Sequence, residues 1–354
     1  MKSKGMLGLD IGSSSIKVVE MTSGSKGMEL LKLGVVPLPP DAIVQGDFLN
    51  VSAIVDGIRE AVSMSGSNLK NVATSVSGHS VIVKRINLPK MSREELEESL
   101  AWEAEQYIPF DVSEVNLDFQ ILSCGDAGEV DETMDILLVA VKKELIDNYT
   151  AAIVEAGLNP CIVEVAGFSV ENAFEANYDP EPDEAVALVN VGSQVVNINV
   201  VINGSPAFTR DIATGGSQYT EEIQKSLSIG YEEAERMKKG DGAAGAASQD
   251  VIPQEVEQAM RGVTDVLVGE IMRSLDFFSA TSEDAQVKRI MLSGGSAKVI
   301  GFQSAFQERT NIPVEIMDPL ARVTPSKFFD SEYLSDIGPS LGVGVGLALR
   351  KADF

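Results

Sequence analysis

The residues with the clearest chemical potential lie near the start of the chain, in a polar turn between two apolar runs. Met6 to Ile11 and Ile16 to Met21 both predict strands, because apolar and small residues recur along them. Gly12 lets the backbone approach a ligand closely, and successive N–H groups of such a turn can surround an anion. A lysine adds positive charge for phosphate, and an aspartate can hold Mg²⁺ through its waters. The candidates for this phosphate and metal site are Asp10, Gly12, Ser13, Ser14, Ser15 and Lys17.

Taken alone, this short motif also fits a glycine-serine hairpin without a ligand, but it occurs twice. Val189 to Ser193 repeats it, so that Asn190 stands 180 positions after Asp10. The second copy again lies between two apolar strands. A further strand, 289–292, runs into another glycine-serine turn near the C-terminus. The added candidates for phosphate binding are Gly192, Ser193, Gly215, Gly216, Gly294, Gly295 and Ser296.

Glycine-serine turns at strand ends in both halves of the chain predict a duplicated α/β protein with a ligand between its lobes. This pattern resembles the actin-like ATPase superfamily, which includes actin, the Hsp70 ATPase domain, sugar kinases and FtsA. The spacing from Asp10 to Lys17 is the one that this superfamily uses for its first phosphate loop. The resemblance implies an α/β fold of the actin-like (RNase H-like) type, with two duplicated lobes and ATP or ADP with Mg²⁺ in the cleft.

Length and composition exclude several other classes. With 354 residues, the chain is too long for one ordinary core, so two lobes are expected. The formal net charge of −25 argues against binding to nucleic acid and against direct adsorption to anionic lipid. No apolar run approaches the roughly 20 residues that a membrane span needs. The single histidine, His79, argues against histidine catalysis and zinc ligation, and the two cysteines suit a reducing cytoplasm.

An inserted α/β subdomain interrupts the first lobe in our interpretation. After three strands, a helix and a fourth strand, the chain continues with a strand, a helix over 93–106, two strands, another helix and a last strand. Ser92 and Glu95 are placed for a capping box at the start of the first of these helices. The predicted domains are 1–78 with 166–180 for the first lobe, 79–165 for the inserted subdomain, and 181–354 for the second lobe, with a helical subdomain at about 217–282.

This insertion limits the resemblance to those members of the superfamily that carry an inserted subdomain. FtsA carries such an insertion, and so does the PilM family of type IV pilus assembly proteins. The run Trp102 to Phe110, followed by Asp118, looks like the PilM signature rather than that of FtsA or a sugar kinase. The match continues through Thr214 to Ser217 and the glycine-rich run Pro339 to Ala348. It implies a cytoplasmic, nucleotide-binding scaffold of the pilus assembly machine.

The resemblance also implies a partner. In the PilM family, the cytoplasmic N-terminal peptide of the membrane protein PilN docks into a groove beside the inserted subdomain. The groove candidates are Tyr107, Ile108 and Phe110, although this apolar cluster could equally pack the subdomain's own core. The chain ends with Arg350 to Phe354, without the amphipathic helix of FtsA. We therefore expect PilN and other inner-membrane or motor proteins of the pilus to recruit the chain to the inner membrane, without membrane insertion of its own.

Hydrolysis in this superfamily requires a phosphate cradle, a metal held through water, and a polar residue that positions the attacking water. Asp10 serves the metal, but Asn190 stands where the family usually has a second acid, and an amide brings no negative charge. We therefore expect ATP binding with slow or absent ATPase activity. Glu164 is the candidate for positioning water, with a surface acid at a strand end as the alternative. Glu222 and Lys225 are the candidates for adenosine contact, with a solvated i,i+3 pair as the alternative.

Other functions on the same fold remain alternatives. They are a filament-forming protein like FtsA or MreB, a scaffold of type II secretion, and a small-molecule kinase. A kinase would need a carboxylate base for its substrate in the cleft, typically an aspartate in a motif that we do not find in this sequence. The sequence leaves the oligomeric state open, including a homo-oligomer.

Overall fold

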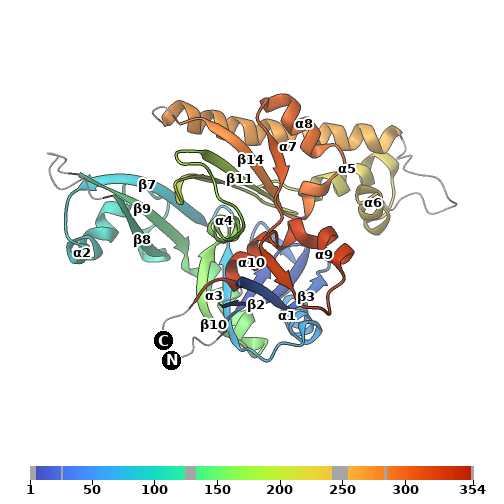
Figure 1. Cartoon of the computed structure of the whole chain (residues 1–354), viewed down its shortest axis with the longest axis horizontal. Coiled ribbons are helices and arrows are strands. Elements are labelled where there is room, and N and C mark those ends of the chain that lie inside the picture. Colours follow the sequence, from blue (N-terminus) through green and yellow to red (C-terminus); the bar gives the residue numbers. More distant parts are fainter. Residues whose placement is uncertain (1–4, 25–26, 124–132, 241–253, 283–284, 352–354) are drawn as a thin grey trace.

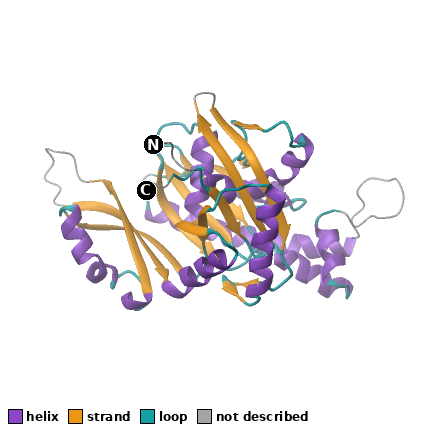
Figure 2. Cartoon of the chain, turned by 90° about the horizontal axis from the view of Figure 1, so that it is seen from below, coloured by secondary structure: helices purple, strands orange, loops and turns teal. Residues whose placement is uncertain are grey.

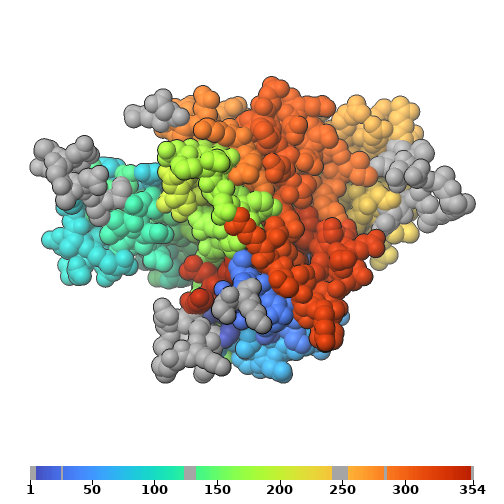
Figure 3. All heavy atoms as spheres, viewed as in Figure 1, coloured from blue at the N-terminus to red at the C-terminus, as the bar shows by residue number. Residues whose placement is uncertain are grey.

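The computed structural model describes residues 5–24, 27–123, 133–240, 254–282 and 285–351. The C-terminal residues 352–354 considered above lie outside these ranges. The described chain forms two lobes, each built on its own sheet, and a smaller unit that projects from the first lobe at one end of the molecule (Figures 1 and 3). This topology confirms the two-lobe α/β fold expected from the sequence.

The first lobe is built on a six-stranded sheet. Its strands are β1 (Leu7–Ile11), β2 (Ser15–Gly24), β3 (Gly27–Pro37), β6 (Asn71–Val76), β10 (Asn159–Val165) and β16 (Val323–Pro325). They lie in the order β10-β6-β1-β2-β3-β16, with β1 to β3 antiparallel and with β6 and β10 added in parallel beside β1. A two-stranded ribbon, β4 (Ile43–Val44) with β5 (Asp47–Phe48), follows β3. The outer face of the sheet is covered by α1 (Val51–Ser65) and α3 (Lys143–Glu155).

The second lobe repeats this arrangement. Its strands are β11 (Ala185–Val191), β12 (Val196–Ile202), β13 (Ser205–Ile212), β14 (Val287–Ser293) and β15 (Val314–Ile316). The order β13-β12-β11-β14-β15 matches β3-β2-β1-β6-β10 of the first lobe, again with three antiparallel and two parallel strands. Its helices are α5 (Ser217–Leu227), α6 (Tyr231–Lys238), α7 (Gln254–Thr281) and α8 (Phe302–Thr310), and η2 (Gly295–Lys298) is a short 3-10 turn. The duplication read from the two hairpin motifs therefore extends to the whole sheet.

Two helices fill the space between the sheets. These are α4 (Ala166–Asn177) and α10 (Gly342–Ala348), which lie at the centre of Figure 1. Their apolar side chains share one core with residues from both sheets, including Val19 of β2 and Leu188 of β11. The lobes are thus joined by buried apolar surface as well as by the chain.

The projecting unit is a three-stranded sheet with one helix, seen at one end of Figure 2. Its elements are β7 (Val81–Pro89), α2 (Arg93–Ala104), the 3-10 turn η1 (Val112–Glu114), β8 (Val115–Ser123) and β9 (Thr133–Lys142). The strand order is β7-β9-β8, so β9 is central. Ser92 and Glu95 form both hydrogen bonds of the expected capping box, at 3.2 Å and 2.8 Å, which fixes the start of α2.

The boundaries of this insertion differ from the sequence interpretation of 79–165. α3 packs with α1 in the first-lobe core, and β10 pairs in parallel with β6. Residues 143–165 therefore belong to the first lobe, and the inserted unit covers 81–142. Periodicity identified both elements correctly, but it does not reveal which sheet a strand joins.

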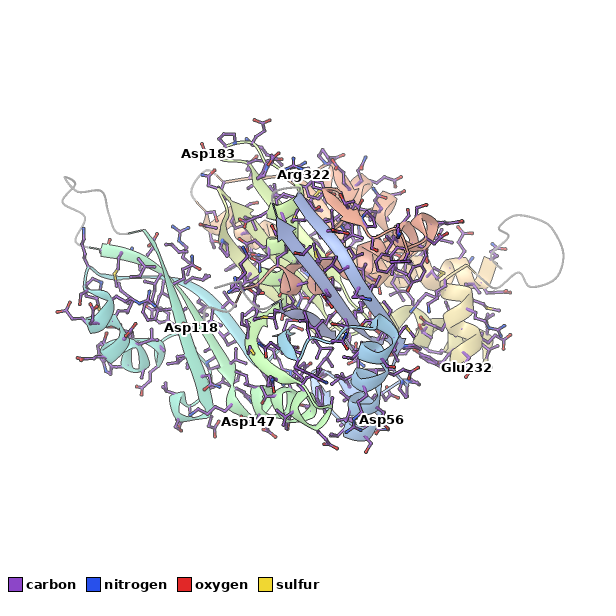
Figure 4. All side chains as sticks on the ribbon, turned by 60° about the horizontal axis from the view of Figure 1, so that its bottom comes forward. Asp56, Asp118, Asp147, Asp183, Glu232 and Arg322 are labelled. Carbon is purple, nitrogen blue, oxygen red and sulfur yellow. The ribbon has the colours of Figure 1, made fainter. Side chains whose placement is uncertain are left out.

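The C-terminal segment also returns to the first lobe, although the sequence assigned 181–354 to the second. β16 pairs in parallel with β3, with Val323 opposite Met28. Arg322, labelled in Figure 4, pairs with Asp179 just after α4. α9 (Ser331–Ile337) and the 3-10 turn η3 (Gly338–Leu341) then lead into α10. No helix of the described ranges is long and apolar enough to cross a membrane.

Candidate functional site

The first hairpin places Asp10 on β1 directly opposite Lys17 on β2. Lys17 Nζ donates to Asp10 Oδ2 at 3.0 Å, and the two side chains are only 11% and 14% exposed. Gly12 N–H closes the turn by donating to Ser15 O at 3.1 Å. A Cβ on Gly12 would lie 3.8 Å from Lys17 Nζ and 3.9 Å from Asp10 Oδ1, so glycine keeps the backbone open beside the ion pair.

Both hairpin turns present backbone donors. In the described part of the chain, the N–H groups of Ser13 and Ser14 have no protein acceptor, and neither have those of Ser193 and Gln194 in the second turn. Backbone N–H groups strongly require a partner, and adjacent ones in a turn bind anions. The donors of the first turn, together with the ammonium group of Lys17, therefore fit the phosphates of a nucleotide.

The second hairpin reproduces this geometry without its charges. Asn190 on β11 lies opposite Asn197 on β12, and its Nδ2 donates to Asn197 Oδ1 at 2.8 Å. Gly192 N–H again closes the turn, donating to Val195 O at 3.0 Å. Two neutral amides thus occupy the places that an acid and a lysine hold in the first hairpin.

A carboxylate that the sequence analysis missed lies behind these amides. Asp211, at the end of β13, accepts from Asn197 Nδ2 at 2.8 Å and from Gly78 N–H of the first lobe at 2.6 Å. Burial raises the pKa of Asp211, and the hydrogen bonds from Asn197 and Gly78 offset part of that rise. Its position depends on a contact 133 residues away along the chain, which no local pattern reveals.

The remaining glycine candidates close around the second hairpin. Gly216 N–H and Ser296 Oγ both donate to Gly192 O, at 2.9 Å and 3.2 Å. A Cβ on Gly216 would lie 1.9 Å from Ser296 Oγ, and one on Gly294 would lie 2.4 Å from Val191 O. These glycines therefore permit close packing of the turns that surround the strand end. The structure brings together Asn190, Gly192, Ser193, Gly215, Gly216, Gly294, Gly295 and Ser296.

The two adenosine candidates on α5 form a surface ion pair. Lys225 Nζ lies 3.5 Å from Glu222 Oε2, and the side chains are 78% and 41% exposed. A buried pair with the same spacing lies on α6. Lys238 Nζ contacts Glu235 Oε2 at 2.6 Å and donates to Gly216 O at 3.4 Å, beside the glycine turn. Because a buried ion pair at the turn fits a ligand-contacting role better than a solvated one, α6 supplies the stronger candidates. The available signal in the sequence was the i,i+3 spacing of Glu235 and Lys238, the same spacing as in Glu222 and Lys225.

Glu164, the candidate for positioning water, is held by other side chains. Its carboxylate accepts from Ser169 Oγ at 2.9 Å and Asn172 Nδ2 at 3.1 Å, and Arg350 lies 3.5 Å away. It lines a cavity of about 630 Å³ that includes none of the candidate phosphate-binding residues. The structure therefore does not bring Glu164 together with the phosphate turns.

This cavity lies between the inserted unit and the first lobe. β8 and β9 form one wall, and β10 and α4 form the other. Asp118, labelled on β8 in Figure 4, belongs to the wall of the inserted unit. Apolar and acidic side chains both face the cavity, among them Leu117, Leu137, Val139, Phe168, Glu171 and Glu175.

The model of the family described as type IV pilus assembly protein PilM matches residues 8–352. The chain belongs to the PilM family. It is similar to a solved PilM–PilN type IV pilus biogenesis complex, with a TM-score of 0.87 and 30% identity over 98% of both chains. It is also similar to the cell division protein FtsA of Bacillus subtilis (strain 168), with 24% identity over 96% of this chain and 81% of FtsA.

A more distant structure shows the fold alone. MreB 5 of Spiroplasma citri, solved with bound AMPPNP, has a TM-score of 0.53 and 12% identity, covering 98% of this chain and 95% of MreB. These similarities establish that this PilM-family chain has the actin-like fold, as the sequence resemblance implied.

The three groove candidates of the PilM resemblance do not line the cavity. Ile108 lies in the core of the inserted unit, and Tyr107 and Phe110 pack against that core. Lys142 Nζ also lies 4.7 Å from the centre of the Phe110 ring. The alternative of a packing role thus fits the structure. The apolar turn after α2 folds back on its own sheet, because that sheet offers the nearest apolar surface to cover.

Glu171 in the cavity wall gives the PilM-family chain a pH-dependent stability. The side chain is 6% exposed, and its pKa is raised from 4.5 to about 7, chiefly by burial. The hydrogen bond from Asn199, at 2.6 Å, lowers this pKa, whereas the charges of Glu175 and Glu164 raise it. The folded state binds the proton more tightly than the unfolded state, so stability falls as the pH rises from 4.5 to about 7.

Glu171→Gln is therefore expected to stabilise the protein at pH 8 and to have little effect at pH 4.5. A raised pKa of this size corresponds to about 3 kcal/mol in the free energy of unfolding, and glutamine keeps an acceptor for Asn199. Urea unfolding of both proteins across this pH range measures the difference. Glu60→Gln on α1, an exposed position, is the control; a Glu171→Gln effect that did not change with pH would contradict the assignment.

Proposed function

We propose that this chain is a cytoplasmic actin-like scaffold of the type IV pilus assembly machine that binds ATP or ADP with Mg²⁺ between its lobes. The observation that carries the nucleotide site is the buried pair of Asp10 and Lys17. It lies beside a turn in which the N–H groups of Ser13 and Ser14 have no acceptor among the described residues. Lys17 and the turn would hold the phosphates. Lys238 and Glu235, beside Gly216, would contact the nucleoside.

The second hairpin, with Asn190 in place of an acid, suits ATP binding better than ATP hydrolysis. Bound Mg²⁺ would neutralise phosphate charge, as in other nucleotide sites. Asp10 would accept hydrogen bonds from its waters as a carboxylate, whereas Asn190 would accept through Oδ1 without adding negative charge. Glu164 is held by Ser169 and Asn172 and faces a different cavity, which leaves the attacking water without a positioning residue among our candidates. We infer slow or absent ATP hydrolysis.

The resident ligand tests this site directly. Purified protein is denatured, and the released small molecules are separated by ion-exchange chromatography. Stoichiometric ATP would support binding without rapid turnover, and ADP would support binding with turnover. If no nucleotide were released and none bound on addition of ATP with Mg²⁺, the proposed site would be wrong.

We further propose that a PilN segment docks in the cavity between the inserted unit and α4. The similar solved structure is a PilM–PilN complex, and this cavity has the apolar and charged walls that a peptide segment needs. Such docking would recruit the chain to the inner face of the inner membrane. Apolar side chains of the peptide would then contact Phe168 and Val139, while the carboxylates of the cavity wall would accept hydrogen bonds from polar groups of the peptide.

Phe168→Ala is expected to weaken binding of the N-terminal PilN peptide by about tenfold or more, since aromatic contacts dominate such interfaces. ATP affinity should not change, because Phe168 lines a cavity whose walls include none of the candidate phosphate-binding residues. Fluorescence anisotropy with a labelled PilN peptide measures the effect. Trp102→Ala, at a 65% exposed position on α2 outside the cavity, is the matched control. Equal peptide affinity for wild type and Phe168→Ala would place the docking site elsewhere.

A further inference from the structure

A chain of hydrogen bonds runs from the backbone of the first lobe to Asn190. Gly78 N–H donates to Asp211 Oδ2 at 2.6 Å, and Asn197 Nδ2 donates to Asp211 Oδ1 at 2.8 Å. Asn190 Nδ2 then donates to Asn197 Oδ1 at 2.8 Å. At the end of this series Asn190 Oδ1 accepts from Ser293 Oγ at 3.4 Å, and an amide oxygen can accept a second hydrogen bond.

We propose that Asp211 is a positioning residue that makes Asn190 present its oxygen, rather than its NH2 group, to the metal side of the nucleotide site. A carboxylate only accepts hydrogen bonds, so Asn197 must turn its NH2 group toward Asp211. Asn197 then offers its oxygen to Asn190, which must in turn donate. The direction of the whole chain is thus set by one acceptor.

This orientation matters because Mg²⁺ keeps several waters at nucleotide sites, and these waters need acceptors. If Oδ1 of Asn190 points outward, it accepts a hydrogen bond from such a water. If the NH2 group points outward, it cannot accept one, because it is itself a donor. Asp211 therefore orients Asn190, through Asn197, so that an acceptor oxygen faces the metal-bound water. An acid at position 190 would provide such an oxygen directly. The inference rests on the proposed nucleotide site.

The same series of hydrogen bonds links the orientation of Asn190 to the contact between the two lobes. Gly78 follows β6 of the first lobe and has a φ of +96°, a conformation that favours glycine. A second hydrogen bond crosses nearby, from Gln45 N–H to Gln194 Oε1 at 2.8 Å. Separation of the lobes at this point would remove one of the two donors that hold Asp211.

Exchanging the carboxylate at position 211 with the amide at position 197 tests the proposal. In Asp211→Asn, one donor must face the new NH2 group unless Asn197 and Asn190 both turn over. In Asn197→Asp, two carboxylates face each other. The double variant, Asp211→Asn with Asn197→Asp, reverses the hydrogen bond between residues 211 and 197 but leaves every donor with an acceptor. Gly78 donates to residue 211, residue 211 donates to residue 197, and Asn190 again donates to residue 197, so that its oxygen still faces outward.

Calorimetry with ATP, in Mg²⁺ and in EDTA, gives the gain in affinity that Mg²⁺ provides. We expect Asp211→Asn to lower this gain about tenfold, as loss of a residue that orients a metal ligand typically does, and the double variant to recover most of it. Asn197→Asp should retain most of the gain, because Asn190 still donates to a carboxylate. The thermal unfolding midpoint without nucleotide should fall in both single variants, because each leaves like groups facing each other, and should recover in the double variant. Asp183→Asn is the matched control, since Asp183 accepts from Asn203 Nδ2 at 2.8 Å in an exposed pair.

Additive losses in the double variant, or unchanged Mg²⁺ dependence in Asp211→Asn, would overturn the role of Asp211. Failure of the wild type to bind ATP would instead overturn the nucleotide site and the metal role together. The unfolding midpoints would still show in that case whether Asp211 sets the direction of the chain.

Discussion

Replacement of Lys17 by alanine is expected to lower the affinity for ATP by about a hundredfold, which corresponds to roughly 3 kcal/mol. The ammonium group lies 3.0 Å from Asp10 Oδ2, and both side chains are largely buried. Its loss removes the side-chain cation that lies beside the first turn. The remaining backbone donors are neutral, so the phosphate charge loses its strongest partner at this hairpin.

The same change also leaves Asp10 without its ion-pair partner. A partly buried carboxylate that loses its cation costs stability and repels the phosphates that Lys17 attracted. Lys17→Met separates these effects only in part, because it keeps the packing but not the charge. Lys17→Arg keeps the charge and should retain more affinity than either, although the planar guanidinium differs in shape from an ammonium group.

Binding of ATP measured by calorimetry, with circular dichroism to confirm folding, gives the result. Lys225→Ala removes a lysine from a 78% exposed surface pair and is the control. If folded Lys17→Ala bound ATP as well as Lys225→Ala, the first hairpin would not be the phosphate site, whatever the fold.

The hairpin was predictable because its contacts are local. Asp10 and Lys17 face each other through the register of two adjacent strands, so their spacing along the sequence determines their distance. The second hairpin has the same register at Asn190 and Asn197, which is why one repeat sufficed to predict two similar sheets. In these two hairpins, the local pattern and the final structure agree.

The parts that the sequence analysis missed depend on distant contacts. Asp211 and Glu171 look like ordinary acids in the sequence, and only packing against Gly78 and Asn199 identifies them as buried. β10 has the pattern of any short strand, and its membership of the first sheet comes from pairing with β6. For the same reason the sequence left two roles open for Phe110, since an apolar residue does not specify which apolar surface it covers; in the structure it packs against the core of the inserted unit.

Replacement of Gly346 by alanine is expected to destabilise the protein by about 3 kcal/mol or more, and to do so without touching a candidate ligand residue. Gly346 lies on α10, where this helix crosses α4. A Cβ there would lie 1.7 Å from Ser169 O and 2.5 Å from Ser169 C. Both are backbone atoms within a helix, so no side-chain rotation can relieve the overlap, and the helices must separate.

Two glycines of α7 provide matched controls with the opposite sign. In the described ranges, a Cβ on Gly262 or Gly269 meets no atom within 4 Å apart from its chain neighbours and the backbone of its own helix. Alanine at either position should stabilise the protein by about 0.5–1 kcal/mol, because alanine loses less backbone entropy in a helix. Urea unfolding of the three variants gives the comparison, and similar values for Gly346→Ala and Gly262→Ala would refute the close crossing of α10 and α4.

Because α10 also packs against the strands beside both hairpins, displacing it by Gly346→Ala should weaken ATP binding as well as stability. A Cβ on Gly344 would lie 2.9 Å from Val19 Cγ2 and 4.0 Å from Asp10 Cβ, and one on Gly342 would lie 3.5 Å from Ser293 Cβ. The helix thus lies against the strands of the first hairpin and against the strand end beside Asn190. If α10 is displaced from α4, both contacts change, so Gly346→Ala that still folds should also bind ATP more weakly than Gly262→Ala. Equal affinities would mean that the two hairpins keep their places without α10.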